Sequence, residues 1–262
     1  MNIFKWDDFR EWERVVRGLM GNHLNDAVIA RFKEEPPDYV VSDDLSWLDS
    51  VVRKVNGVRR PDSAQLLTRK LLEYYTHITA FHGCRPTSIE TYTEFGLQAC
   101  DPAKMQEVAV QIFGDNPKVW EAIEHLKGSS FEHSYEEHNQ GKVYFTLTQE
   151  EIVDYCGHYL LYGSEYLLCI ANSIGAARKL RERGRATIIE CNVPITRIGH
   201  GFIKELAGSI LEKMFERVLD PESSMGSGFG FYVKGSLPAE SIASFHFPRQ
   251  IPNPHNGRRL ED

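Results

Sequence analysis

Apolar residues recur at every third or fourth position through the first 76 residues, which is the period of an amphipathic helix. Ser42 is a good N-cap for one helix, which Asn56-Gly57 ends, and Pro61 and Ser63 open the next helix. Residues 1–76 are therefore predicted to form a helical subdomain. The positions expected on its core faces are Trp6, Phe9, Trp12, Val16, Leu19, Met20, Leu24, Ala27, Val28, Phe32, Leu45, Leu48, Val52, Val55, Leu66, Leu67, Leu71 and Leu72.

From residue 77 onward, segments in which apolar residues alternate, as in strands, are interspersed with segments in which they recur every three or four positions, as in helices. Strands are predicted at 78–82, 143–148, 186–193 and 229–233, and an amphipathic helix at 201–218. A turn after 82 leads to a short helix ended by Gly96, and Asp101-Pro102 and Asn116-Pro117 each open a helix. This order predicts a mixed α+β domain over 77–262.

A long helix is predicted after Thr148, a good N-cap that is followed by two acidic residues. Tyr155, Tyr159, Tyr162 and Tyr166 would then form one stripe along it, with Glu165 beside the stripe. A packing face is the plain interpretation of such a stripe. The tail from residue 248 has several prolines and is expected to be irregular.

The composition narrows the class of protein. No apolar run reaches the length of a membrane span, and the charged N-terminus has no apolar signal core, so a cytoplasmic protein is expected. The five cysteines have no CxxC spacing and are expected to be reduced thiols. A net charge of −7 argues mildly against general nucleic-acid binding, although the basic run 178–185 allows either a structural role or a phosphate contact.

Two segments could suggest a metal site or a dinucleotide-binding loop. His133 and His138, with Glu136 and Glu137, lie in a polar loop that lacks the spacing of a zinc site, so no metal is expected. The GSGFG run at 226–230 precedes a predicted strand and does not open a helix, so it is not a dinucleotide fingerprint.

Two segments carry more specific chemistry. HGCRPTS at 82–88, followed by a Gly-Leu pair at 96–97, places a histidine and a glycine at a strand end. An imidazole can bond a ribose hydroxyl there, and a bare glycine backbone can bond a flat carboxamide. GKVYFTLTQEEIVDYC at 141–156 follows downstream. The two ordered segments resemble motifs of the ADP-ribosyltransferases, especially the poly(ADP-ribose) polymerase type.

The resemblance implies a split mixed sheet and NAD as a substrate, with no metal. By it His82 holds the ribose next to nicotinamide, and Gly83 bonds the carboxamide through its backbone. Tyr155 stacks on the nicotinamide ring, Tyr144 supports the other side, and Arg85 reaches the diphosphate or a ribose. His82, Tyr144 and an acid would carry the catalysis.

The sequence departs from the family at that acid. The family usually has a Glu at the start of the last strand, where this chain has Gly228-Phe229-Gly230. Glu165 is the first candidate to replace it, because a carboxylate normally assists an oxocarbenium-like centre, and Glu240 is the second. An enzyme that works without the acid, and a weakened or inactive chain, also stay open.

Three functions follow. The first is a mono-ADP-ribosyltransferase resembling toxin and defence enzymes, since the departure argues against polymer synthesis. Its acceptor would be a protein or a nucleic acid, and an antitoxin is a possible partner. The second is a non-catalytic module on the same fold that binds NAD, ADP-ribose or a partner. The third is an RNA phosphotransferase, which resembles a pattern with more arginines around the histidine than Arg85 alone supplies.

Overall fold

A computed structural model describes residues 1–127, 139–224, 226–253 and 259–261. The chain forms two compact units, and each combines segments that are distant in sequence. The first contains residues 1–79 and 194–229, and the second contains 80–193 and 230–262. The predicted boundary at 76/77 cuts the chain once, whereas the segment 194–229 belongs with the N-terminal helices.

The first unit is built from helices around an aromatic core. Its elements are β1 (Ile3–Phe4), α1 (Phe9–Met20), α2 (Asp26–Glu34), α3 (Ser46–Asn56), α4 (Ser63–Tyr74) and α13 (His200–Leu219), with short 3₁₀ turns at Gly21–Leu24 and Ile195–Arg197. Phe215 of α13 packs edge-on against Phe32, with centroids 4.5 Å apart, and against Trp47 at 5.1 Å. Gly208 lets α13 approach the main chain closely, because a Cβ there would lie 2.2 Å from the Ser42 carbonyl oxygen.

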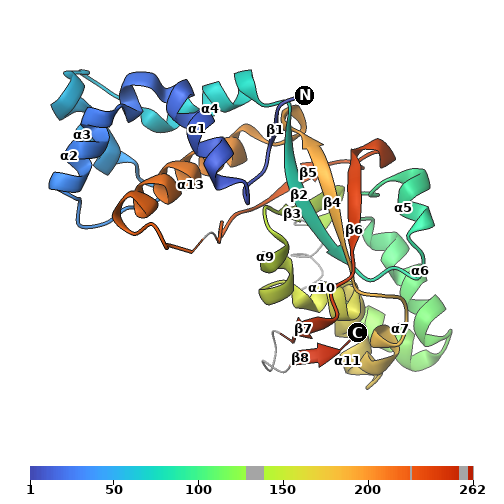
Figure 1. The fold of residues 1–262 in the computed structure, drawn as a ribbon. Helices are drawn as coiled ribbons and strands as arrows, with labels where there is room; N and C mark the ends of the chain where they lie inside the picture. The colour runs from blue at the N-terminus through green and yellow to red at the C-terminus, as the bar shows by residue number, and fades with distance from the viewer. Residues whose placement is uncertain (128–138, 225, 254–258, 262) are drawn as a thin grey trace. The chain divides into compact units, whose positions relative to one another are not determined.

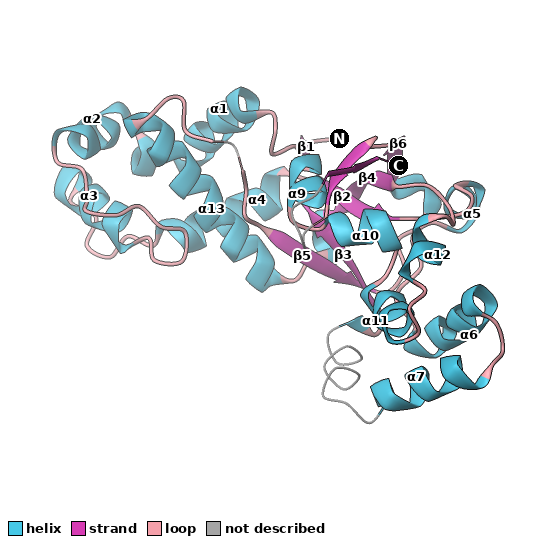
Figure 2. Cartoon of the chain, turned by 90° about the horizontal axis from the view of Figure 1, so that it is seen from below, coloured by secondary structure: helices cyan, strands magenta, loops and turns pink. Residues whose placement is uncertain are grey.

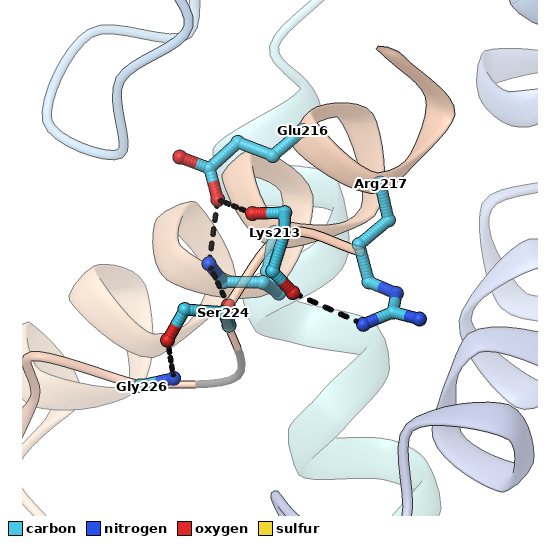
Figure 3. Close-up of polar contacts among 6 residues, drawn as sticks. Lys213, Glu216, Arg217, Ser224 and Gly226 are labelled. Atoms are coloured by element: carbon cyan, nitrogen blue, oxygen red, sulfur yellow. Dashed lines mark hydrogen bonds and ion pairs between the residues drawn. The ribbon is translucent and has the colours of Figure 1, made fainter. Parts of the chain in front are cut away.

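Polar contacts tie the segment after α13 back onto the helix (Figure 3). Lys213 Nζ contacts the Glu216 carboxylate at 2.5 Å and the Ser224 carbonyl at 2.7 Å, and Arg217 donates to the Ser223 carbonyl at 3.2 Å. The Lys213 side chain is 11% exposed, so this ion pair is shielded from water. The chain leaving α13 is therefore held to the last turns of the helix.

Among the described residues, six strands form one sheet. The order is β5 (Gly230–Lys234), β3 (Lys142–Thr146), β2 (His77–Cys84), β4 (Thr187–Pro194) and β6 (Ile242–His246), and β1 pairs in parallel with the start of β2 (Figure 1). β3 pairs with β5 along its whole length, from Lys142 opposite Lys234 to Thr146 opposite Gly230. β2 pairs with β3 in antiparallel register at Phe81 and Thr146. A separate pair, β7 (Gln250–Pro252) and β8 (Arg259–Glu261), is also antiparallel.

Helices of the second unit cover this sheet and build a second core beside it (Figure 2). They are α5 (Glu90–Phe95), α6 (Pro102–Phe113), α7 (Pro117–Lys127), α9 (Gln149–Asp154), α10 (Gly157–Tyr162), α11 (Glu165–Ser173) and α12 (Ala177–Arg181), with a 3₁₀ turn, η3, at Ala239–Ser241. Phe81 and Ile188 of the sheet pack against Ile152, Leu160 and Leu161, so α9 and α10 lie on one face. α6, α7, α11 and α12 share another apolar cluster.

The helix ends were predicted correctly where a capping residue or a terminal glycine determines them. Asp101 accepts a hydrogen bond from the Ala103 amide with Pro102 at the first helical position, and Thr148 accepts from the Glu151 amide. Gly57 and Gly96 end α3 and α5 with positive φ angles of 67° and 71°, as predicted.

Three local predictions were wrong. The long helix after Thr148 is divided into α9, α10 and α11, so its tyrosines do not form one stripe. Gly163 ends α10 at φ 81°, and Gly157 begins it where a Cβ would lie 2.6 Å from the Pro252 carbonyl oxygen. Ser42 is not a cap, because α3 begins at Ser46. The tail contains β7 and β8, which pair with each other.

The structure is thus a mixed α+β protein, as expected from the order of elements. Within the described ranges, no helix is both apolar enough and long enough to span a bilayer.

Candidate active site

His82 lies beside a pair that joins β2 to β3. It follows Phe81, which pairs with Thr146, and its Nδ1 lies 2.9 Å from the carbonyl oxygen of Tyr144, two residues before Thr146. A carbonyl only accepts, so Nδ1–H donates, and the neutral ring keeps Nε2 as an acceptor. Burial lowers the pKa of His82, and the hydrogen bond to Tyr144 opposes this in part. The ring is therefore held neutral with a defined tautomer.

Gly83 is packed from one side. An added Cβ would lie 2.8 Å from Ile152 Cγ2 of α9 and 3.6 Å from Leu160 Cδ2 of α10. A side chain here would have to displace α9, so the sequence needs glycine for close packing. Gly83 is buried near the end of β2, and its proposed bond to a carboxamide stays a prediction.

A cavity of about 420 Å³ opens beside His82. It mixes hydroxyl, amide and cationic groups with apolar side chains, which is the usual make-up of a small-molecule site. His82 and Arg85 line it, whereas Gly83, Tyr144, Tyr155 and Glu165 do not belong to the described lining. The remaining lining residues are Cys84, Pro86, Thr87, Ser88, Thr91, Tyr92, Gly96, Leu97, Gln98, Met105, Val108, Ile112, Tyr162, Gly163, Ser164, Leu167, Leu180 and Arg183.

Arg85 is committed to the main chain. Its Nη1 donates to the Leu160 carbonyl at 3.0 Å and its Nε to the Arg183 carbonyl at 3.1 Å, and its Nη2 donates to the Arg181 carbonyl. Three of the five guanidinium N–H groups are thus used in joining β2 to α10 and to the turn after α12. The family resemblance implied that Arg85 reaches the diphosphate or a ribose, whereas here it bonds three main-chain carbonyls.

Tyr144 lies on the β3–β5 ribbon. Its side chain is 40% exposed, and its ring centroid is 5.5 Å from that of Tyr232, the residue directly opposite on β5. Burial and the neighbouring Tyr232 raise the pKa of Tyr144, so the phenol stays protonated at neutral pH. Sequence reasoning missed Tyr232, which could have been found by aligning the two predicted strands in antiparallel register.

Tyr155 is an exposed aromatic residue at the end of α9. Its side chain is 77% exposed. It is the C-cap residue of α9, directly after Asp154, and its amide donates to the Glu151 carbonyl at 3.1 Å. An exposed aromatic ring can serve as a stacking platform.

Glu165 lies in a polar cluster at the first position of α11. Its Oε1 is 3.1 Å from His158 Nε2, and its carboxylate hydrogen-bonds Tyr159. Burial, with Glu165 next, raises the pKa of Tyr159, and Tyr144 lies close enough to add to the effect. Tyr159 was assigned to packing, and His158 was not identified as a site residue. Both lie near Glu165 only because the helix breaks between α10 and α11, and the sequence analysis predicted one continuous helix there.

The other acidic candidates differ in position. Every residue of β5, from Gly230 to Lys234, is uncharged or a lysine, so the strand itself carries no carboxylate. Glu240 is exposed on η3, a turn that packs against Gly96 through Pro238 and Ala239. Of the two residues predicted to replace the missing acid, Glu165 has the more structured surroundings.

Cys84 does not behave as a nucleophile. Burial raises the pKa of its thiol to about 12, and Tyr92 of α5 hydrogen-bonds it. Only the thiolate is reactive, so at neutral pH this buried thiol is inert and serves as part of the cavity wall.

A second polar cluster joins β4 and β6. His246 Nε2 lies 3.0 Å from Glu190 Oε2 and 2.8 Å from Ser244 Oγ, and Ser244 donates to the same Glu190 oxygen at 2.7 Å. In a Ser-His-acid triad the serine and the acid contact different ring nitrogens. Here both meet Nε2, so the cluster is a cross-strand network and lacks the geometry of a nucleophilic triad.

No metal-binding group of three or more His, Cys, Asp or Glu side chains occurs in the part of the chain that the structure describes. His133, His138, Glu136 and Glu137 lie outside it.

Comparisons with known proteins give no match: no family model, no curated protein and no solved structure is similar to this chain at a significant level.

Proposed function

We propose that this chain is an NAD-dependent mono-ADP-ribosyltransferase. One observation carries the proposal: an imidazole, tethered through Nδ1, lines a mixed polar and apolar cavity beside the Phe81–Thr146 pair of β2 and β3. Its Nε2 can accept a hydrogen bond from a ribose hydroxyl. The resemblance of two ordered sequence motifs gives the imidazole this task.

In the reaction, the bond between the ribose carbon and the nicotinamide nitrogen breaks, and its electron pair leaves with nicotinamide. The acceptor's nucleophile forms the new bond to that carbon and gives up its proton. His82 positions the ribose, the Gly83 backbone bonds the carboxamide, and Tyr155 stacks on the leaving ring. The charge that develops on the ribose is stabilised by a nearby carboxylate.

Glu165 is our choice for that carboxylate. Its carboxylate lies 3.1 Å from His158 Nε2 and hydrogen-bonds Tyr159. Orientation by fixed partners is what electrostatic stabilisation of a transition state needs, because a group that is already in place does not have to reorganise during the reaction.

The test is the release of labelled nicotinamide from NAD in the presence of cell extract. His82→Ala is expected to lower the rate on the order of 100-fold, as removal of an orienting hydrogen bond in a transition state does. His77→Ala is the matched control, because His77 lies on the same strand and contacts Thr76, away from the cavity.

Two acid variants complete the experiment. Glu165→Gln should lower nicotinamide release, whereas Glu240→Gln, on the exposed η3 turn, should leave it unchanged. If the wild-type chain neither releases nicotinamide nor labels any macromolecule, the transferase proposal is lost.

A non-catalytic module for NAD or ADP-ribose is the second candidate, and the absence of a carboxylate on β5 favours it. Calorimetry separates the two functions, because NAD binding without nicotinamide release is expected only of the module. The third candidate, an RNA phosphotransferase, needs cationic side chains directed at phosphate, and the use of Arg85 on three carbonyls weakens it.

A further inference from the structure

The charge of the second unit is unevenly distributed. Five of the ten Lys and Arg residues between positions 80 and 193 fall within residues 178–185, a segment that we term the basic rim. Glu182 is the only acidic residue between positions 166 and 189. The five cations are Arg178, Lys179, Arg181, Arg183 and Arg185.

A purely structural role does not account for this charge. Cations near a helix C-terminus are stabilising, but α12 has five residues and its dipole is correspondingly small. Within the described part of the chain, Arg178 is the one rim cation that forms an ion pair with a carboxylate, Glu182 at 2.5 Å, and its side chain is still 90% exposed. Lys179, Arg183 and Arg185 are also exposed, and Arg185 lies over the Phe247 ring at 4.0 Å. Like charges gathered in one segment repel one another, and a bound anion relieves that repulsion.

The main chain of the basic rim is rigid. The Arg85 side chain holds the carbonyls of Arg181 and Arg183, and the Arg185 amide donates to the Pro86 carbonyl at 3.0 Å. Gly184 adopts φ 73°, and a Cβ there would lie 2.3 Å from the same carbonyl oxygen. The exposed cations are therefore presented from a fixed turn.

The basic rim also borders the His82 cavity. Arg183 and Leu180 line that cavity, and so do Arg85 and Pro86, the residues to which the rim is fastened. An anion held along the rim thus runs past the opening where the proposed transfer takes place.

We propose that the basic rim binds the phosphate chain of a single-stranded nucleic acid, and that this strand is the acceptor. The inference rests on the proposed function. A row of exposed cations matches a polyanion better than the two charges of one dinucleotide. A single strand can place a base at the cavity, whereas a base inside a duplex has to be flipped out first.

The experiment measures fluorescence anisotropy of labelled oligo-U and oligo-dT, each of about 20 nucleotides, without NAD. The logarithm of the binding constant should fall with the logarithm of salt concentration by about 0.7 for each phosphate contact. The triple variant Arg178→Gln, Lys179→Gln, Arg183→Gln should reduce that slope by about 2 and the affinity on the order of tenfold. Lys104→Gln with Lys118→Gln, exposed cations elsewhere on the same unit, should change neither.

A variant that is expected to raise oligonucleotide affinity excludes misfolding as the explanation of these results. Glu182→Gln removes the only acid of the rim and should raise oligonucleotide affinity, an effect that a loss of structure cannot produce. Binding that is insensitive to salt and to the rim variants overturns the inference, and so does a loss of NAD affinity in the triple variant with unchanged oligonucleotide binding.

The outcomes for the two proposals are separable. His82→Ala should leave oligonucleotide binding unchanged. Oligonucleotide binding without nicotinamide release removes the transferase and leaves the basic rim as a nucleic-acid site. Nicotinamide release without binding through the rim removes only the present inference.

Discussion

The proposed task of His82 is to accept a hydrogen bond from a ribose hydroxyl through Nε2. That nitrogen is an acceptor because Nδ1 carries the ring proton. The Tyr144 carbonyl accepts a hydrogen bond from Nδ1–H, beside the Phe81–Thr146 pair of β2 and β3. A histidine that instead had both nitrogens protonated would offer no acceptor to a ribose hydroxyl. Burial works in the same direction, since it disfavours the charged ring.

The lowered pKa of His82 predicts how stability depends on pH. The unfolded chain takes up the proton near pH 6.5, and the folded chain takes it up only at a lower pH. The stabilising contribution is therefore complete above about pH 6.5 and is lost as the pH falls below it, by up to about 1.4 kcal/mol per pH unit.

Denaturant titrations of the wild type and of His82→Gln, from neutral to mildly acidic pH, measure this effect. The free energy of unfolding should fall more steeply with decreasing pH in the wild type than in the variant. Because the remaining histidines are common to both proteins, the difference in slope isolates His82. Equal slopes contradict the assignment of a lowered pKa.

The sequence predicted the position of a residue correctly where its own strand determines that position. It did not predict contacts between residues that are distant in the sequence. His82 and Gly83 lie at the end of β2 as expected. The partners of Arg85 are carbonyls of residues 160, 181 and 183, and no local pattern marks a carbonyl as available. The contact between Tyr159 and Glu165 was hidden because it crosses a helix break.

At the scale of elements, local caps and tertiary contacts decide different boundaries. Asp101-Pro102 and Thr148 begin their helices through their own side chains, so the sequence suffices. The end of α9 and the start of α10 depend on Gly157 lying against the Pro252 carbonyl, nearly one hundred residues away, which periodicity cannot reveal. The same distant pairing makes β7 and β8 out of a proline-containing tail.

Arg85 links three elements, and its removal has a predicted cost. Arg85→Met keeps the apolar stem and loses the hydrogen bonds to three carbonyls, so the free energy of unfolding should fall by about 2–4 kcal/mol. Thermal or denaturant unfolding measures this. Arg183→Gln, a change in an exposed arginine of the same turn, is the matched control and should cost less than about 0.5 kcal/mol. Equal stability of the two variants would show that Arg85 does not fasten the turn.

At the scale of the whole chain, the segment 194–229 leaves one unit and joins the other. Its helix α13 buries residues along most of its length in the first unit, and Phe215 contacts Phe32 and Trp47. The sequence predicted an amphipathic helix at 201–218 but not its partner, because an apolar face does not specify which other face covers it.

This arrangement predicts how fragments behave. A fragment of residues 77–262 retains α13 but lacks α2, α3 and α4, so Phe215 loses its partners Phe32 and Trp47. We expect this fragment to bind a hydrophobic dye and to unfold without cooperativity.

Replacing 195–229 in the same fragment by a flexible Gly-Ser linker of about 20 residues, which spans roughly 25 Å, removes the uncovered helix. Dye binding and circular dichroism compare the two fragments. The linker version should unfold cooperatively with less dye binding, whereas cooperative unfolding of the unmodified fragment would show that α13 does not need the N-terminal helices.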